Sequence, residues 1–227
     1  MESSEIALGH TETGLTARMD SMRTRGLTRE GLLRGVSELS RSDADLAAVV
    51  RRFGPPPMWS RRPGFATLVR IILEQQVSLA SADATYTRLT GALGRVTARR
   101  VAASSLPELR DHGLTRQKAG YCRDLAELIL AGGLDLRGLE DADDSTAQRA
   151  LLQVRGIGPW SADVYMLMAL GRPDVWPDGD LALAEATRQV KRLRARPTDD
   201  RLRRLASAWS PWRSVAARIL WHHYLSS

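Results

Sequence analysis

A carboxylate at the start of a predicted helix is the first feature of this sequence that could do chemistry. The stretch 172–183 reads Arg-Pro-Asp-Val-Trp-Pro-Asp-Gly-Asp-Leu-Ala-Leu, and its prolines and glycines predict a loop that ends near residue 179. Asp180 follows, at a position where an aspartate often caps a helix. A helix N-terminus favours an ionised carboxylate and holds it in one geometry. Asp180 is therefore either a helix cap only or a cap that also stabilises positive charge in a reaction.

Upstream of that loop, two glycines separate two predicted helices. The stretch 151–162 reads Leu-Leu-Gln-Val-Arg-Gly-Ile-Gly-Pro-Trp-Ser-Ala. Gly156 and Gly158 supply backbone freedom for a tight turn, and Pro159 suits the first position of the next helix. The amides of the turn and the helix N-terminus after it form a site for a phosphate oxygen. An ordinary turn between two helices would show the same Gly-x-Gly spacing, so spacing alone leaves both interpretations open.

The charge of the chain is basic and unevenly distributed. Its 227 residues include 33 lysines and arginines and 26 aspartates and glutamates, which gives a net charge of +7. Residues 181–227 hold ten basic residues and three acidic ones, so this region alone accounts for +7 and the rest of the chain is balanced. A basic region on a neutral body suits a polyanionic partner. A solvated, arginine-rich helix would give the same count.

Composition excludes several classes of site and of protein. A single cysteine, Cys122, leaves no intramolecular disulfide, no four-cysteine iron–sulfur cluster and no cysteine-based zinc site. No run of 18 apolar residues is present, and the first residues lack the basic start and apolar stretch of a signal peptide. We therefore expect an intracellular, cytoplasmic protein without a membrane span.

The elements that must position these groups are helices. Apolar residues such as Phe65, Leu68 and Ile72 recur with helical spacing, and no stretch alternates as a strand would. Gly54 and the three prolines after it end one such segment. The composition of residues 1–25 predicts a loose tail. The pattern predicts an all-α fold, with helices that include 79–92, 96–104, 106–111, 116–131, 145–154 and 159–170.

The two motifs resemble those of DNA repair glycosylases. The string Leu-x-x-Val-x-Gly-Ile-Gly-Pro-Trp-Ser-Ala resembles the helix-hairpin-helix motif of that superfamily, and Val-Trp-Pro-Asp-Gly-Asp-Leu resembles the catalytic segment of the 3-methyladenine DNA glycosylase II family. The resemblance implies that Asp180 is catalytic. It also implies that the hairpin binds a DNA phosphate and that hairpin carbonyls hold a monovalent cation, K⁺ or Na⁺. The residues implied for DNA are Arg155, Gly156, Ile157, Gly158 and Ser161, and those for the cation are the carbonyls of Leu152, Val154 and Ile157.

The resemblance also implies where a flipped base would lie. The string Trp-x-Pro-Trp-Arg-Ser-x-Ala at 209–216 is similar to the same family, in which the tryptophan that matches Trp221 forms a wall of the base pocket. Trp160 offers a stacking face for a cationic base, although a core tryptophan would also fit its apolar helix. The family has a pocket tyrosine at the position of Val164, and Tyr165 is adjacent. We therefore expect Trp160, Trp221, Val164 and Tyr165 at the pocket.

A third segment resembles the part of the family that enters the minor groove. It reads Leu-Glu-Gln-Gln-Val-Ser from residue 73 to residue 78. By position, Gln76 fills the gap left by the flipped nucleotide, with Gln75 and Ser78 beside it, whereas the best-known members use a leucine as the wedge. Glutamines at a helix C-terminus would also make local hydrogen bonds, so this alternative stays open.

The implied function is a monofunctional DNA glycosylase of base excision repair. Cleaving an N-glycosidic bond passes through an oxocarbenium-like state, which an ionised carboxylate stabilises. A 3- or 7-methylpurine already carries a positive charge and leaves as a neutral base, so no general acid is needed. The lysine that bifunctional members use as a nucleophile is replaced by Trp160, so we expect no lyase activity. A helix-hairpin-helix module that binds DNA without catalysis is the alternative.

These inferences define the expected molecule. We expect a monomer that acts at the nucleoid on duplex DNA containing alkylated bases, with no cofactor required for chemistry and no iron–sulfur cluster. We expect two helical subdomains on either side of a DNA-binding groove, one of residues 26–62 and 184–227 and the other of residues 63–183. The best-known bacterial members carry a further N-terminal α/β domain, which a chain of 227 residues is too short to contain.

Overall fold

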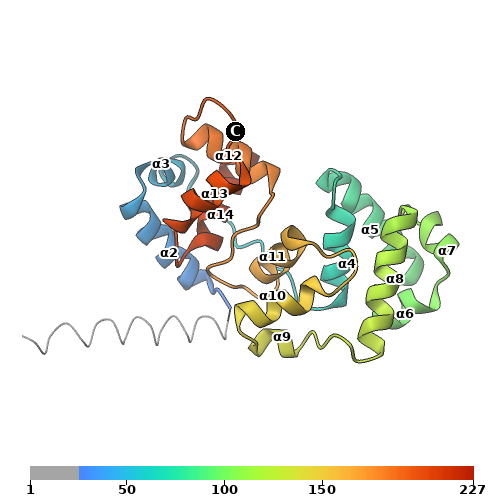
Figure 1. Cartoon of the computed structure of the whole chain (residues 1–227). Helices are drawn as coiled ribbons and strands as arrows, with labels where there is room; N and C mark the ends of the chain where they lie inside the picture. The colour runs from blue at the N-terminus through green and yellow to red at the C-terminus, as the bar shows by residue number, and fades with distance from the viewer. Residues whose placement is uncertain (1–25) are drawn as a thin grey trace, which may run out of the picture.

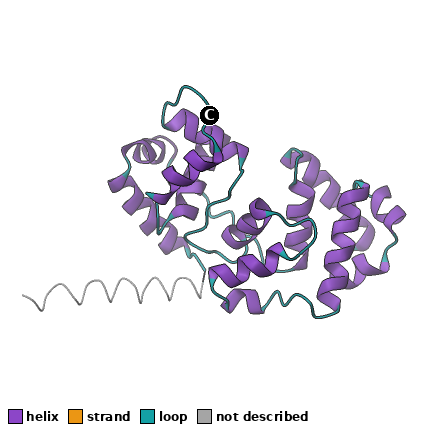
Figure 2. Cartoon of the chain, viewed as in Figure 1, coloured by secondary structure: helices purple, strands orange, loops and turns teal. Residues whose placement is uncertain are grey.

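The structure is a computed structural model that describes residues 26–227. These residues form helices joined by loops, and none of them forms a strand (Figure 2). The all-α prediction is confirmed. The tail predicted for residues 1–25 lies outside the described residues.

Most helices follow one another through short connections, with longer loops before α4 and α12, and the six helices predicted with explicit bounds agree with the structure to within about two residues. The pattern did not predict α9, which has four residues, or α13, whose sequence is mostly charged. No helix within residues 26–227 is long and apolar enough to cross a membrane. In chain order they are α2 (Arg29–Ser42), α3 (Ala44–Phe53), α4 (Phe65–Glu74), α5 (Leu79–Leu93), α6 (Ala98–Ala103), α7 (Leu106–Asp111), α8 (Arg116–Leu130), α9 (Gly138–Asp141), α10 (Asp144–Leu152), α11 (Pro159–Met168), α12 (Leu181–Val190), α13 (Asp199–Ser207) and α14 (Arg213–Ser226).

The helices form two groups that lie side by side (Figure 1), and each group encloses one hydrophobic cluster. Helices α4 to α11 enclose the first cluster, and α2, α3 and α12 to α14 enclose the second. Helix α11 contributes to both, through Val164 on one side and Leu167 on the other. Trp176 and Leu183 pack in the second cluster, so the chain passes from one cluster to the other before the boundary predicted at residue 183.

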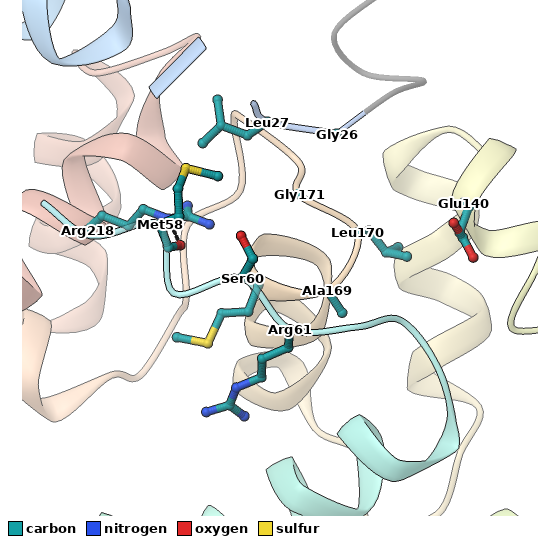
Figure 3. Close-up of a pocket in the computed structure, with 11 residues that line it drawn as sticks. Gly26, Leu27, Met58, Ser60, Arg61, Glu140, Ala169, Leu170, Gly171 and Arg218 are labelled. Atoms are coloured by element: carbon teal, nitrogen blue, oxygen red, sulfur yellow. Dashed lines mark hydrogen bonds between the residues drawn. The ribbon is translucent and has the colours of Figure 1, made fainter. Parts of the chain in front are cut away.

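A buried arginine joins the two groups of helices. Arg218 of α14 is 1% exposed, and burial lowers the pKa of its guanidinium to about 10. The guanidinium donates hydrogen bonds to the carbonyl oxygens of Met58 (2.9 Å), Ser214 (3.0 Å) and Leu167 (2.9 Å). These bonds tie α14 to α11 and to the loop after α3. They lie beside a cavity of about 200 Å³ that Met58, Gly171 and Arg218 help to line (Figure 3).

Candidate functional site

Asp180 lies directly before α12 and caps that helix. Its Oδ1 atom accepts a hydrogen bond from the backbone N–H of Leu183 at 2.8 Å, which confirms the predicted cap. Asp180 is 9% exposed, so little of the carboxylate is open to water. The cap fixes the side chain at the point where the loop 172–179 enters the second group of helices.

Two tryptophans from distant parts of the chain donate hydrogen bonds to the same carboxylate. Trp160 Nε1 donates to Asp180 Oδ2 at 2.9 Å, and Trp221 Nε1 donates to Oδ1 at 3.3 Å. Trp160 lies in the first turn of α11 and Trp221 in α14, so three helices meet at this carboxylate. An ionised carboxylate only accepts hydrogen bonds, and these neighbours all donate. The arrangement therefore holds an ionised carboxylate in one orientation.

Further carboxylates, which the sequence interpretation missed, anchor the loop before α12. Asp163 of α11 accepts hydrogen bonds from the Gln148 amide (2.8 Å) and from the backbone N–H of Asp178 (3.4 Å). Asp163 is 4% exposed, and burial raises its pKa to about 6. Asp174 accepts two hydrogen bonds from the Arg213 guanidinium, at 2.9 and 3.0 Å. Asp163 is the only charged residue of α11, and that isolated charge is the signal that could have revealed it.

The two hairpin glycines have different surroundings. Gly156 has a φ of +86°, and a β-carbon there would lie 2.3 Å from ring atoms of Tyr121. A β-carbon on Gly158 would meet no atom within 4 Å. The turn itself therefore requires Gly156, whereas Gly158 faces open space. Pro159 is the first residue of α11, as predicted, and the first amides of a helix have no intrahelical carbonyl to bond.

Some of the predicted DNA contacts are occupied by the protein itself. The Gln75 side-chain amide donates hydrogen bonds to the Gly156 carbonyl oxygen (2.7 Å) and to the Ser161 hydroxyl (2.9 Å). Ser161 is 2% exposed and its hydroxyl is taken by Gln75, so its side chain is not open to DNA here, and its contact with DNA stays a prediction. The alternative of local hydrogen bonds holds for Gln75. The Arg155 side chain is 75% exposed while it pairs with Asp124 at 2.9 Å.

The loop between α4 and α5 presents Gln76 to solvent. Helix α4 ends at Glu74, and Gln76 has a φ of +56°. The Ser78 hydroxyl accepts a hydrogen bond from the Ser81 amide at 3.2 Å and so caps α5. Gln76 and Ser78 are exposed, and the insertion of Gln76 into DNA stays a prediction.

Tyr165 and Val164 are core residues, which corrects their assignment to the pocket. Tyr165 is fully buried, its hydroxyl accepts a hydrogen bond from the Gly64 amide at 2.9 Å, and burial raises its pKa to about 12. Val164 is 2% exposed. Because α11 lies between both clusters, its central residues are covered on every side. Trp160, near its exposed end, is half-buried, and Trp221 is 8% exposed.

The carbonyls predicted for a cation lie where α10 passes into the hairpin. Helix α10 ends at Leu152, and the Val154 carbonyl oxygen accepts a hydrogen bond from the Ile157 amide at 3.0 Å. A carbonyl oxygen has a second lone pair, and neutral oxygens are ligands that suit hard cations. Within residues 26–227, no three His, Cys, Asp or Glu side chains are grouped to hold a metal ion. The donor set at the hairpin is thus compatible with a monovalent cation.

Comparison with known families bears directly on this site. The family described as "HhH-GPD superfamily base excision DNA repair protein" matches residues 69–211, a range that contains the loop after α4, the hairpin and Asp180. The chain belongs to this family. The helix-hairpin-helix prediction from the sequence is thereby confirmed.

Two individual relatives are named as enzymes that act on 3-methyladenine in DNA. The chain is 27% identical over 188 residues to the putative DNA-3-methyladenine glycosylase YfjP of Bacillus subtilis, an alignment that covers 79% of this chain and 66% of YfjP. It is similar to a solved DNA-3-methyladenine glycosidase of Bacillus halodurans, with a TM-score of 0.70, 28% identity, and coverage of 86% of this chain and 89% of that one.

A glycosylase that was solved with bound DNA has the same fold. The 3-methyladenine DNA glycosylase Mag1 of Schizosaccharomyces pombe, solved with abasic DNA, matches with a TM-score of 0.77 at 23% identity, over 83% of this chain and 95% of that chain. The chain spans just under two thirds of YfjP. The relatives' names confirm the resemblance to 3-methyladenine DNA glycosylases that the motifs indicated.

Proposed function

We propose that the chain is a monofunctional DNA glycosylase that releases alkylated purines, of the 3-methyladenine and 7-methylguanine type, from duplex DNA. The observation that carries this proposal is the Asp180 carboxylate, held by Leu183, Trp160 and Trp221. A hairpin that only bound DNA would not need a nearly buried carboxylate fixed by two indoles from different helices. The names of the similar proteins point to the same substrate class.

The chemistry follows from the position of this one carboxylate. As the N-glycosidic bond lengthens, positive charge develops on the sugar, and a fixed carboxylate in a partly dry site stabilises that charge. The donors around Asp180 are already in place, so no reorganisation is needed at the moment of reaction. A cationic alkylpurine leaves as a neutral base, which makes a second acidic group unnecessary. The indole faces of Trp160 and Trp221 are the surfaces on which such a base would stack.

The lysines support a monofunctional rather than a bifunctional enzyme. The chain has two lysines, Lys118 and Lys191. Lys118 Nζ donates to two backbone carbonyls at the end of α4, and Lys191 Nζ pairs with Asp43 and Asp45. Each ammonium is thus engaged elsewhere, and a Schiff base with the sugar would require an uncharged amine near Asp180.

The hairpin would anchor the DNA. The amides at Gly156 and Gly158 and the N-terminus of α11 would bind one backbone phosphate, and the carbonyls of Leu152, Val154 and Ile157 would hold K⁺ or Na⁺ next to it. A cation there strengthens the attraction for the phosphate and stiffens the turn. Exposed arginines of the basic C-terminal region would add affinity that falls with salt.

The test is base release from a duplex that contains 3-methyladenine and 7-methylguanine, followed by alkali to cut abasic sites. Asp180→Asn keeps a residue that caps helices well but loses the charge, so we expect folding to be retained and release to fall by at least a hundredfold. Asp199→Asn makes the same chemical change at the exposed start of α13 and should release base at the wild-type rate.

Three results would contradict the proposal in different ways. Strand cuts without alkali, together with borohydride trapping of a covalent adduct, would indicate a bifunctional lyase. Salt-sensitive DNA binding with no release from either lesion would indicate the non-catalytic binding module. Release that survives Asp180→Asn would show that another group performs the chemistry.

A further inference from the structure

The loop between α4 and α5 has a conformation that the rest of the protein must maintain. Gln76 has a φ of +56°, a backbone conformation that residues other than glycine rarely adopt. Val77 and Leu79 beside it are apolar, yet they are 44% and 63% exposed. Such a backbone persists only where its neighbours fix it, and strained positions of this kind gather at functional sites. Side chains from other elements must therefore fix this loop.

Lys118 of α8 is hydrogen-bonded to the backbone where this loop begins. Its Nζ atom, on α8, donates hydrogen bonds to the carbonyl oxygens of Leu73 (2.7 Å) and Gln75 (2.8 Å). These carbonyls lie at the end of α4, where a helix leaves its acceptors without intrahelical donors. Burial lowers the pKa of the ammonium, and within residues 26–227 no carboxylate lies in ion-pair contact with it. The protein therefore places a partly desolvated charge against two backbone oxygens rather than against a counter-ion.

Gln75 ties the same loop to the hairpin. Its side-chain Nε2 donates to the Gly156 carbonyl oxygen at 2.7 Å and to the Ser161 hydroxyl at 2.9 Å. One residue thus gives its carbonyl to Lys118 and its amide to the turn. The loop and the hairpin are 81 residues apart in sequence, between Gln75 and Gly156, and this amide joins them directly.

Helix α8 supports both segments. Besides Lys118, it carries Tyr121, whose ring lies against the α-carbon of Gly156, and Asp124, which pairs with Arg155 at 2.9 Å. Lys118, Tyr121 and Asp124 are spaced by three residues, so they lie along one face of the helix. The exposed loop and the phosphate-binding turn therefore share one rigid base.

We infer that Lys118 and Gln75 are positioning residues that set the distance between the hairpin and the tip of the loop at Gln76, and so control the opening of the base stack. This inference rests on the proposed function. If the hairpin binds one phosphate, the hydrogen bonds of Lys118 and Gln75 form a rigid link that places Gln76 at one defined base-pair step of the duplex. A loop without the link would still let the hairpin bind. Single-stranded DNA has no base pair to open, so the link should have little effect on base release from a single strand.

The test compares Lys118→Met and Gln75→Met with wild type in single-turnover release of 7-methylguanine from a duplex and from the same single strand. We expect the duplex rate to fall at least tenfold and the single-strand rate to stay within twofold. Lys118→Arg, which keeps donors at the end of the side chain, should recover part of the duplex rate. Lys191→Met, at the chain's other lysine, controls for lost stability and should leave the ratio of the two rates unchanged.

A second readout needs no chemistry. A 2-aminopurine placed next to an abasic-site analogue becomes more fluorescent when it is unstacked. We expect this increase with wild type and with Lys191→Met, and we expect Lys118→Met and Gln75→Met to lose most of it at saturating protein. If wild type released no base but this difference remained, the proposed function would fail and the positioning role would stand. Equal loss of the duplex and single-strand rates, or full brightening by both variants, would overturn the positioning role.

Discussion

Substituting alanine for each hairpin glycine separates folding from DNA binding. At Gly156, with its φ of +86°, the new β-carbon would lie 2.3 Å from the Tyr121 ring. The left-handed backbone costs about 1–2 kcal/mol for a residue with a β-carbon, and displacing a packed ring costs a further 1–3 kcal/mol or so. We expect Gly156→Ala to lower the free energy of unfolding by about 2–5 kcal/mol, which for a chain of this size lowers Tm by roughly 5–15 °C.

Gly158→Ala is the matched change without an internal clash. Its φ of −92° is allowed for any residue, and no atom lies within 4 Å of the new β-carbon. We expect its free energy of unfolding to stay within about 1 kcal/mol of wild type. If the hairpin binds a DNA phosphate as proposed, the methyl group would hinder its approach, so affinity for an abasic duplex, measured by fluorescence anisotropy, should fall at least tenfold. Wild-type stability of Gly156→Ala, or wild-type affinity of Gly158→Ala, would refute this interpretation of the turn.

Three further predictions concern charged and hydrogen-bonded groups. Trp160→Phe removes the N–H that Asp180 accepts, so the single-turnover rate of base release should fall by about tenfold or more, and an unchanged rate would show that this bond is not used. Asp163→Asn removes a carboxyl whose pKa burial raises to about 6. Because the native carboxyl keeps its proton to higher pH than the unfolded one, its burial costs nothing below about pH 4 and at most about 3 kcal/mol above pH 6. The free energy of unfolding of the variant, measured in urea titrations, should therefore rise relative to that of wild type as the pH increases from 4 to 7. A difference that did not change with pH would contradict this prediction. Lys191→Met leaves Asp43 without its cationic partner. Burial alone would raise the pKa of Asp43, but the hydrogen bonds from Lys191 and Trp209 hold that pKa below its usual value. We expect a loss of about 2 kcal/mol at pH 7 that shrinks below pH 4, where the carboxylate protonates, as thermal melts at both pH values would show.

The sequence was sufficient for the fold and for the elements that carry the site. Helical periodicity predicted most helix positions, and Pro159 and Asp180 marked the starts of α11 and α12, because these residues have strong positional preferences at helix ends. Helix α9 escaped because four residues show no periodicity. The passage of the chain between clusters near Trp176 escaped because a loop residue shows no pattern of burial.

Contacts between distant segments could not be predicted from local pattern. Tyr165 was assigned to the pocket because it stands next to Val164, but α11 is apolar nearly all round, and such a helix gives no sign of which side remains open. Gln75 and Ser161 both looked like surface polar groups, and only the tertiary structure shows that they bond to each other. The Asp163 anchor needed the same information, since its partners lie 15 residues away on either side.

Apart from Trp221, which lies inside α14, the groups proposed to act on DNA lie at or next to helix ends, and this explains how loops can hold them firmly. A helix end leaves backbone groups unpaired. Asp180 satisfies an amide of α12, Lys118 satisfies carbonyls of α4, and the first amides of α11 are left for a phosphate. Because the helices themselves are fixed in two packed clusters, their ends keep constant separations. Helix α11 bears the hairpin at its start and Trp160 in its first turn, so a cavity made in its buried middle would be expected to disturb Asp180 through Trp160 without touching either residue.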